Sequence, residues 1–155
     1  MKRHILPLFS GLLALLLPMY APLTGATHPQ LQAEAGNYRV FLGVIPAARI
    51  AEYPDLVPHG HPTKSGKNLY HVELAVYDKS TGQRVEDASV MVTSVAFGLS
   101  ARRKAMQRME MAGAITYCNY FRMLPGDHYT FNVDIRRAAW DAPLQLELAY
   151  GQVAH

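Results

Sequence analysis

Three histidines occur close together in one part of the chain. His59 and His61 are separated by a single glycine in "PHGHP", and His71 follows in "NLYHVELAVYD". Two imidazoles at this spacing on a flexible loop can bind one ion, and copper and zinc are common partners of imidazole nitrogen. The pattern predicts a metal site in which His71 is the third imidazole and His128 a more distant candidate. The alternative is that the loop histidines are simply solvated.

Three methionines form a second group of candidate ligands. Met106, Met109 and Met111 occur in "MQRMEM". A thioether is a soft ligand that suits Cu(I) and binds without losing a proton. Charged neighbours such as Arg108 and Glu110 indicate an exposed segment, where methionine is less expected than in a core. The group therefore favours copper as the metal, and the alternative is that these methionines fill gaps in the core.

The chain contains no motif that predicts an enzyme. It has no G-x-S-x-G, no H-E-x-x-H and no glycine-rich phosphate loop. Its single cysteine, Cys118, excludes an intramolecular disulfide. Because Cys118 lies in "TYCNYF", an aromatic strand pattern, we expect it to be buried rather than reactive. The sequence thus predicts a binding protein and not an enzyme.

The N terminus has the layout of a secretory signal peptide. Lys2 and Arg3 precede an apolar run at residues 5–17, and small residues follow up to Ala26. We expect cleavage after Ala26 and export to the periplasm, the alternative being a retained membrane anchor. Two of the 15 basic residues and none of the 12 acidic residues lie in the signal. The mature chain therefore has 13 basic and 12 acidic residues and a net charge of +1. That balance argues against a nucleic-acid partner.

Residues 27–155 are predicted to form one all-β domain. After a polar lead at residues 27–36, hydrophobic alternation predicts about seven strands. They are "NYRVFLGVIP", "NLYHVELAVYD", "RVEDASVMVTSV", "QRMEM", "ITYCNYFRM", "YTFNVDIRR" and "LQLELAY". Residues 46–67 are a long loop with room for one helical turn in "AARIAEY", and Gly82 is expected in a turn.

Two structural assignments remain open at this stage. Ala101–Met111 has the helix propensity of Ala, Arg, Lys, Met, Gln and Glu, but surrounding strands favour a bent loop that enters a strand at Gln107–Met111. The overall pattern predicts an antiparallel immunoglobulin-like β-sandwich, with a small open barrel as the alternative. The predicted core residues are Val72, Leu74, Val76, Val90, Val92, Val133, Ile135 and Leu146.

Residues 66–135 resemble the YtkA-like and FixH-like domains of exported bacterial proteins. The similarity lies in "GKNLYHVELAVYDKSTGQRVEDASVMV", the methionine segment and "YCNYFRMLPGDHYTFNVDI". These domains are similar in outline to CopC-like copper carriers, and FixH-like proteins are implicated in supplying copper to a respiratory oxidase. The resemblance implies a periplasmic copper carrier or accessory protein. The alternative is a metal-free β-sandwich that binds another periplasmic or membrane protein, as an assembly factor would.

Overall fold

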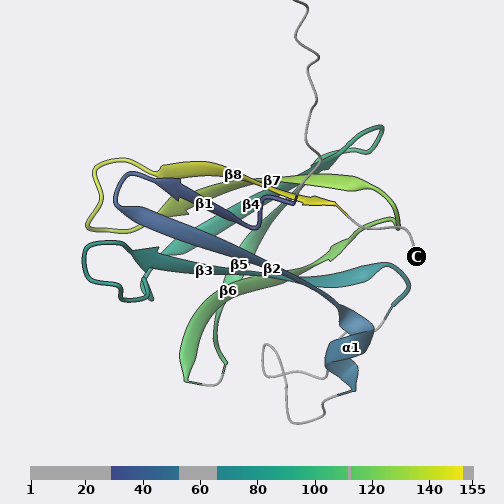
Figure 1. Cartoon of the computed structure of the whole chain (residues 1–155), viewed down its shortest axis with the longest axis horizontal. Coiled ribbons are helices and arrows are strands. Elements are labelled where there is room, and N and C mark those ends of the chain that lie inside the picture. The colour runs from purple at the N-terminus through teal and green to yellow at the C-terminus, as the bar shows by residue number, and fades with distance from the viewer. Residues whose placement is uncertain (1–28, 53–65, 112, 152–155) are drawn as a thin grey trace, which may run out of the picture.

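The computed structural model describes residues 29–52, 66–111 and 113–151, and these form an antiparallel sheet of eight strands (Figure 1). The predicted signal peptide lies outside the described residues. The elements are β1 (Gln32–Ala35), β2 (Tyr38–Pro46), α1 (Ala47–Ala51), β3 (Leu69–Asp78), β4 (Ser89–Ala96), β5 (Arg102–Met111), β6 (Ala114–Arg122), β7 (His128–Arg136) and β8 (Leu144–Gly151). No helix in the described ranges is long and apolar enough to span a membrane.

The sheet folds over on itself and almost closes. Its strand order is β1-β2-β3-β6-β5-β4-β7-β8. β5 belongs to both halves, because Met106 pairs with Val90 of β4 whereas Gln107 pairs with Cys118 of β6. At the open side, a bridge between Gln30 and β8 brings β1 beside β8. The prediction of an all-β fold is therefore confirmed, in a form between a sandwich and a small barrel.

The core lies between the two halves and follows the predicted alternation. Leu74, Phe121 and Phe131 are among its largest fully buried side chains. Seven predicted core residues are buried, namely Val72, Leu74, Val76, Val90, Val92, Val133 and Ile135. Leu146 is only partly buried, because it lies on the edge strand β8, and Leu148 takes the fully buried position there.

Two segments differ from the sequence predictions. β1 lies in what was expected to be a polar lead, and its exposed Gln32 and Glu34 explain why no hydrophobic period marks it. β5 begins at Arg102, so the predicted loop before Gln107 is wrong. The first half of β5 pairs with β4, and this tertiary pairing overrides the helix propensity of the segment. The predicted helical turn is confirmed as α1.

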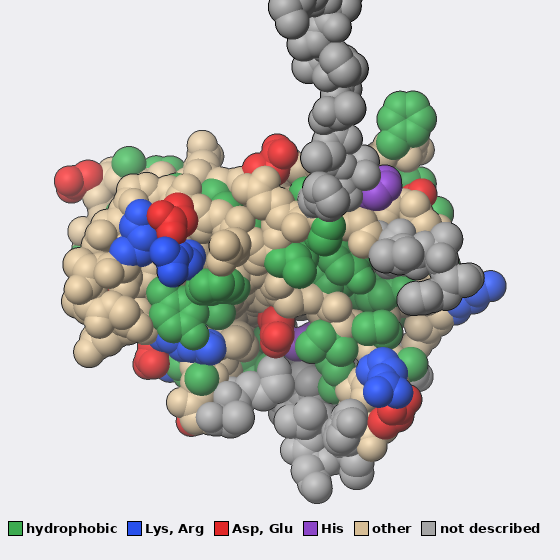
Figure 2. Space-filling model, in the orientation of Figure 1, with side chains coloured by type: hydrophobic (Ala, Val, Ile, Leu, Met, Phe, Trp, Pro, Cys, Tyr) green, Lys and Arg blue, Asp and Glu red, His purple; other side chains and the backbone are tan. Residues whose placement is uncertain are grey.

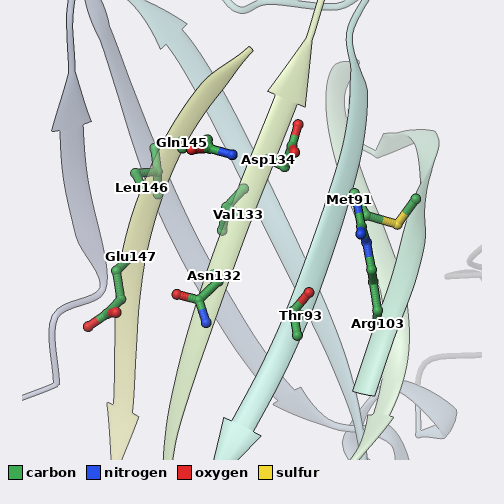
Figure 3. Close-up of a pocket in the computed structure, with 9 residues that line it drawn as sticks. All are labelled: Met91, Thr93, Arg103, Asn132, Val133, Asp134, Gln145, Leu146 and Glu147. Carbon is green, nitrogen blue, oxygen red and sulfur yellow. The ribbon is translucent and has the colours of Figure 1, made fainter. Parts of the chain in front are cut away.

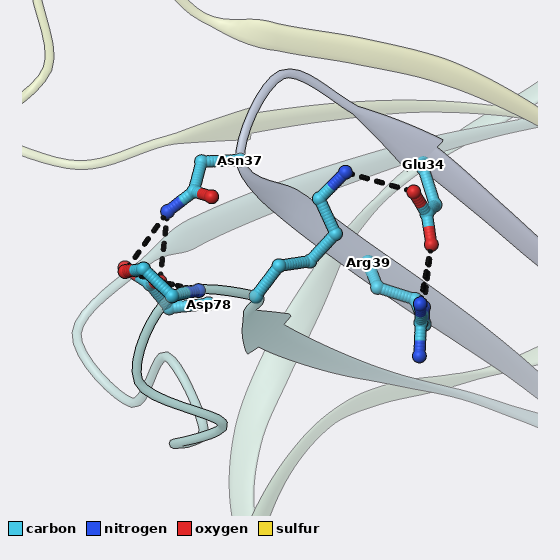
Figure 4. Close-up of polar contacts among 6 residues, drawn as sticks. Glu34, Asn37, Arg39 and Asp78 are labelled. Carbon is cyan, nitrogen blue, oxygen red and sulfur yellow. Dashed lines mark hydrogen bonds and ion pairs between the residues drawn. The ribbon is translucent and has the colours of Figure 1, made fainter.

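Polar contacts tie the β1–β2 hairpin to the turn after β3 (Figure 4). Nδ2 of Asn37 donates to Oδ1 of Asp78 at 2.9 Å, and Nζ of Lys79 donates to Glu34 at 2.8 Å. Arg39 donates to the other oxygen of Glu34 at 2.7 Å. Gly82 closes the turn with φ of 69°, as its predicted turn role requires. Because these pairs are exposed, they fix the turn geometry more than they stabilise the fold.

Candidate metal centre

The outer face of the half formed by β2, β3, β6 and the second part of β5 holds a group of chemically distinct side chains. We call it the outer cluster, and it consists of His71, Glu73, Met109, Cys118 and Tyr120. Alternation along each strand turns these side chains away from the core. The strand register places Glu73 opposite Cys118 and His71 opposite Tyr120. Although they lie outside the main core, His71 and Cys118 are both 0% exposed.

Local sequence features explain how this face becomes buried. α1 contacts β2 and β3, and its Ala47 and Ile50 are buried. Gly43 lies opposite Glu73 in the register. A Cβ at position 43 would be 2.6 Å from Cγ of Glu73, so the glycine leaves the room that this carboxylate occupies. The chain therefore accommodates a carboxylate on a largely covered surface.

The two sulfur atoms of the outer cluster lie next to each other. Sγ of Cys118 is 3.8 Å from Sδ of Met109 and 3.6 Å from the carbonyl oxygen of Gln107. Burial, and then the charge of Glu73, raises the pKa of the Cys118 thiol to about 12. The thiol is therefore protonated and inert as a nucleophile, and a metal would have to displace its proton. The expectation that Cys118 is buried is confirmed.

The polar members of the outer cluster are also held away from water. Burial raises the pKa of Glu73, and the positive charge of Arg84 partly opposes this shift. Oε2 of Glu73 is buried and has no hydrogen-bond partner among the residues that the structure describes. The His71 ring packs against the Tyr120 ring, with 5.1 Å between centroids. A buried carboxylate oxygen without a donor is a costly feature that a bound cation would satisfy.

The structure brings only some of the predicted ligands onto one face. His71 and Met109 both belong to the outer cluster, with Cys118 between their strands. Met106 instead points into the core, because residues three apart on a strand face opposite sides. Met111 ends β5 opposite Ala114, and its backbone alone is described. His59 and His61 lie outside the described residues.

The remaining histidine candidate is separate from the outer cluster. His128 is exposed at the start of β7, opposite Gly151. Within the described ranges, no three His, Cys, Asp or Glu side chains lie close enough together to hold a metal ion. The outer cluster is therefore a partial donor set that includes a thioether.

Sequence reasoning did not select Glu73 and Cys118 as site residues. Alternation alone already places Glu73 on the same face of β3 as His71. The contact between Cys118 and Met109 depends on the β5–β6 register. The pairing of β6 with β3 brings Cys118 and Met109 beside Glu73. Neither the β5–β6 pairing nor the β3–β6 pairing can be predicted from a short stretch of sequence.

A polar groove of about 550 Å³ lies on the outer face of the other half of the sheet (Figure 3). It is lined by side chains from β4, β5, β7 and β8, which include Met91, Arg103, Asn132 and Glu147. None of the predicted ligands lines it. It is therefore a second surface feature, separate from the outer cluster.

Comparison with known proteins identifies similar folds rather than a family. No family model matches the chain. No curated protein matches it either. The resemblance to YtkA-like and FixH-like domains therefore stays a prediction.

Several solved structures share the fold. A copper-bound variant of FetP from uropathogenic Escherichia coli has a TM-score of 0.64 and 11% identity over 83% of this chain and 98% of that one. The copper-reconstituted P19 protein from Campylobacter jejuni has a TM-score of 0.63 and 8% identity over 81% and 94%. A DUF4426 family protein from Pseudomonas aeruginosa has a TM-score of 0.60 and 14% identity over 80% and 94%. At these identities the likeness establishes the fold.

Proposed function

We propose that this protein is an exported, periplasmic carrier for a metal ion, and that the metal is copper. The observation on which the proposal depends is the outer cluster, in which imidazole, thioether, thiol and carboxylate groups share one largely covered face. Two proteins of the same fold have been solved with copper, and FetP has been produced in a bacterial periplasm. In this proposal the protein binds and delivers the metal and catalyses no reaction.

The sulfur pair fits a soft metal ion. A metal–sulfur bond of about 2.3 Å with tetrahedral angles places two sulfur ligands about 3.8 Å apart. Cys118 and Met109 have this separation, 3.8 Å, before any metal is bound. Thiolate ligands suit both Cu(I) and Zn²⁺, and the thioether of Met109 favours Cu(I) of the two. The carboxylate of Glu73, opposite Cys118, would offset part of the cost of burying a cation.

Imidazole nitrogen would complete the donor set. His71 lies on the same face as the sulfur pair, and we propose that it is a ligand. His59 and His61 enter the proposal on sequence grounds, as ligands that would favour Cu(II). Their segment joins α1 to the start of β3, and Pro46 pairs with Tyr70 beside His71. Both attachment points of that segment are thus at the His71 end of β3.

The proposal is tested by titrating purified protein, without residues 1–26, with Cu(I) against a chromophoric chelator under reducing conditions. Met109→Leu keeps the side-chain volume but removes the sulfur. We expect it to weaken Cu(I) binding by at least the roughly 10–100-fold seen when supporting groups of metal sites are removed. Cys118→Ala should do the same. Met106→Leu is the matched control, because Met106 faces the core, and its affinity should equal that of the wild type.

The histidines are tested separately with Cu(II). The double variant His59→Ala, His61→Ala should weaken Cu(II) binding more than Cu(I) binding, and Met109→Leu should do the reverse. If the wild type binds neither ion, or if Met109→Leu and Met106→Leu bind Cu(I) equally, the metal-carrier proposal is wrong. A metal-free protein-binding module is then the remaining candidate.

A further inference from the structure

The hairpin between β4 and β5 presents hydrophobic side chains to solvent at one end of the molecule. Phe97 is fully exposed, and Leu99 is 42% exposed. Gly98 between them has φ of +73°, a left-handed conformation that closes the hairpin tightly. The hairpin projects from the body of the sheet in Figure 1, and Figure 2 shows hydrophobic atoms standing clear of the surface at this end. A fully exposed aromatic ring contributes nothing to the stability of the monomer.

A second loop extends this hydrophobic surface. Ala96 at the end of β4 pairs with Tyr129 at the start of β7, which brings the β6–β7 loop beside the hairpin. Leu124 in that loop is 46% exposed. A groove of about 380 Å³ separates the two loops, with Leu99 and Leu124 in its lining. We call Phe97, Leu99 and Leu124 together the apolar tip.

Positive charge borders the apolar tip. Arg102 and Arg122 line the groove beside it, and both are exposed. Neither takes part in an ion pair among the described residues. The groove lining contains no Asp or Glu, and Asp127 is the one acidic residue of the β6–β7 loop. Arg122 donates one hydrogen bond, to the carbonyl oxygen of Lys67 at 3.4 Å. Two guanidinium groups without a carboxylate partner in the described ranges, beside exposed Leu and Phe side chains, match a surface of phosphate groups over hydrocarbon.

Both ends of the described chain lie at this same end of the molecule. Gln30 bridges Ala149, and Gly151 pairs with His128 at the end of the β6–β7 loop. The described chain therefore enters the fold beside the apolar tip.

We infer that the apolar tip docks the protein on the surface of an anionic phospholipid bilayer. Phe97 and Leu99 insert among the acyl chains next to the headgroups, and Arg102 and Arg122 bind lipid phosphates. A bilayer suits the tip better than a protein partner because the most exposed side chain, Phe97, projects outward instead of lining the groove. The inference goes beyond metal binding and does not depend on it.

The test is vesicle flotation with protein purified without residues 1–26, since all eight strands and the core lie within residues 30–151. The probes are vesicles of phosphatidylcholine alone and of phosphatidylcholine with about one third phosphatidylglycerol. Wild type should float with the anionic vesicles and only weakly with the neutral ones. Phe97→Ser should abolish flotation, and Arg122→Glu should weaken it by at least the roughly five-fold expected from one basic residue near the surface. Added salt should also weaken flotation with the anionic vesicles, because it screens the attraction between the arginines and the lipid phosphates.

Matched variants separate the inference from loss of fold. Phe41→Ser removes another exposed phenylalanine, on the outer face of β2, and Arg136→Glu reverses an exposed arginine of β7. Both should float like wild type, and all variants should keep the wild-type circular dichroism spectrum. The inference is overturned if wild type binds no vesicle, if it binds neutral vesicles equally well, or if Phe97→Ser floats normally. Phe97-dependent dimers in sedimentation, without flotation, would assign the tip to a second copy instead.

Discussion

At the scale of single residues, Glu73 is the most unusual side chain in the described structure. It is a carboxylate on a mostly covered sheet face, in room left by Gly43, opposite a buried thiol. Burial raises its pKa from the ordinary value of 4.5. The raised pKa means that the ionised carboxylate opposes folding at neutral pH, and the cation proposed above would offset that cost.

The first prediction concerns Glu73→Gln in metal-free protein. The raised pKa means that the folded state favours the neutral carboxyl group. Ionised Glu73 therefore lowers the free energy of unfolding. This loss is absent below pH 4.5 and develops as the pH rises from 4.5 toward the raised pKa of the folded state. The variant should therefore melt at a higher temperature than wild type near neutral pH, and at nearly the same temperature in acid. Thermal melts followed by circular dichroism with a chelator present measure both differences.

Glu34→Gln is the control of opposite sign. Hydrogen bonds from Lys79 and Arg39 lower the pKa of Glu34. Ionised Glu34 therefore adds to the free energy of unfolding above pH 4.5, and this stabilisation is lost as the pH falls through the lowered pKa of the folded state. This variant should melt slightly lower than wild type near neutral pH, because Glu34 is exposed and its pairs are screened. A metal-free Glu73→Gln protein that is less stable than wild type near neutral pH would show that the carboxylate is a structural group.

At the scale of elements, β5 and β1 determine how the sheet closes. β5 turns from β4 to β6 between Met106 and Gln107 and so joins the two halves. β1 has four residues and completes the other side, where the Gln30–Ala149 bridge approaches β8. β5 is thus central to the sheet, whereas β1 is a short edge element with little buried surface.

The second prediction is an order of local stability. Peptides that cover Gln32–Ala35 should exchange their amide hydrogens much faster than peptides from β6, which is paired on both sides and has Tyr117, Cys118 and Phe121 buried. Hydrogen exchange followed by mass spectrometry measures this order. Equal protection of β1 and β6 would mean that the sheet closes as one cooperative barrel.

At the scale of the whole molecule, one continuous core stabilises both halves of the sheet. Side chains from β2, β3, β4, β6, β7 and β8 all belong to it. Phe121 and Phe131 make an edge-to-face contact across the two halves, with 6.0 Å between ring centroids. Loss of packing at any point of this core should therefore destabilise the entire domain in one transition.

The third prediction compares two leucines. Leu74→Ala removes a fully buried side chain and should lower the free energy of unfolding by about 2–4 kcal/mol. Leu99→Ala removes the same atoms from the apolar tip, where the side chain is 42% exposed. This variant should change the free energy of unfolding by less than about 0.5 kcal/mol. Urea denaturation gives both values. A similar loss for both variants would mean that the tip packs against the domain rather than projecting from it.

The alternation of hydrophobic and polar side chains along a strand is a local property of the sequence. The sequence by itself therefore determined the features that follow from this alternation. Because successive strand residues face opposite sides, the chain already indicated an all-β fold and most of the core, including Val72, Leu74 and Val76. It indicated the turn at Gly82 and the burial of Cys118 as well. It could not indicate β1, whose exposed Gln32 and Glu34 leave no hydrophobic period.

Only the tertiary structure decided which residues from distant strands meet. The β3–β6 and β5–β6 registers bring Glu73, Cys118 and Met109 together from separate parts of the chain. Local spacing grouped Met106 with Met109, but the strand conformation of β5 turned them to opposite faces. Register depends on the packing of whole strands against one another, and no short stretch of sequence contains that information.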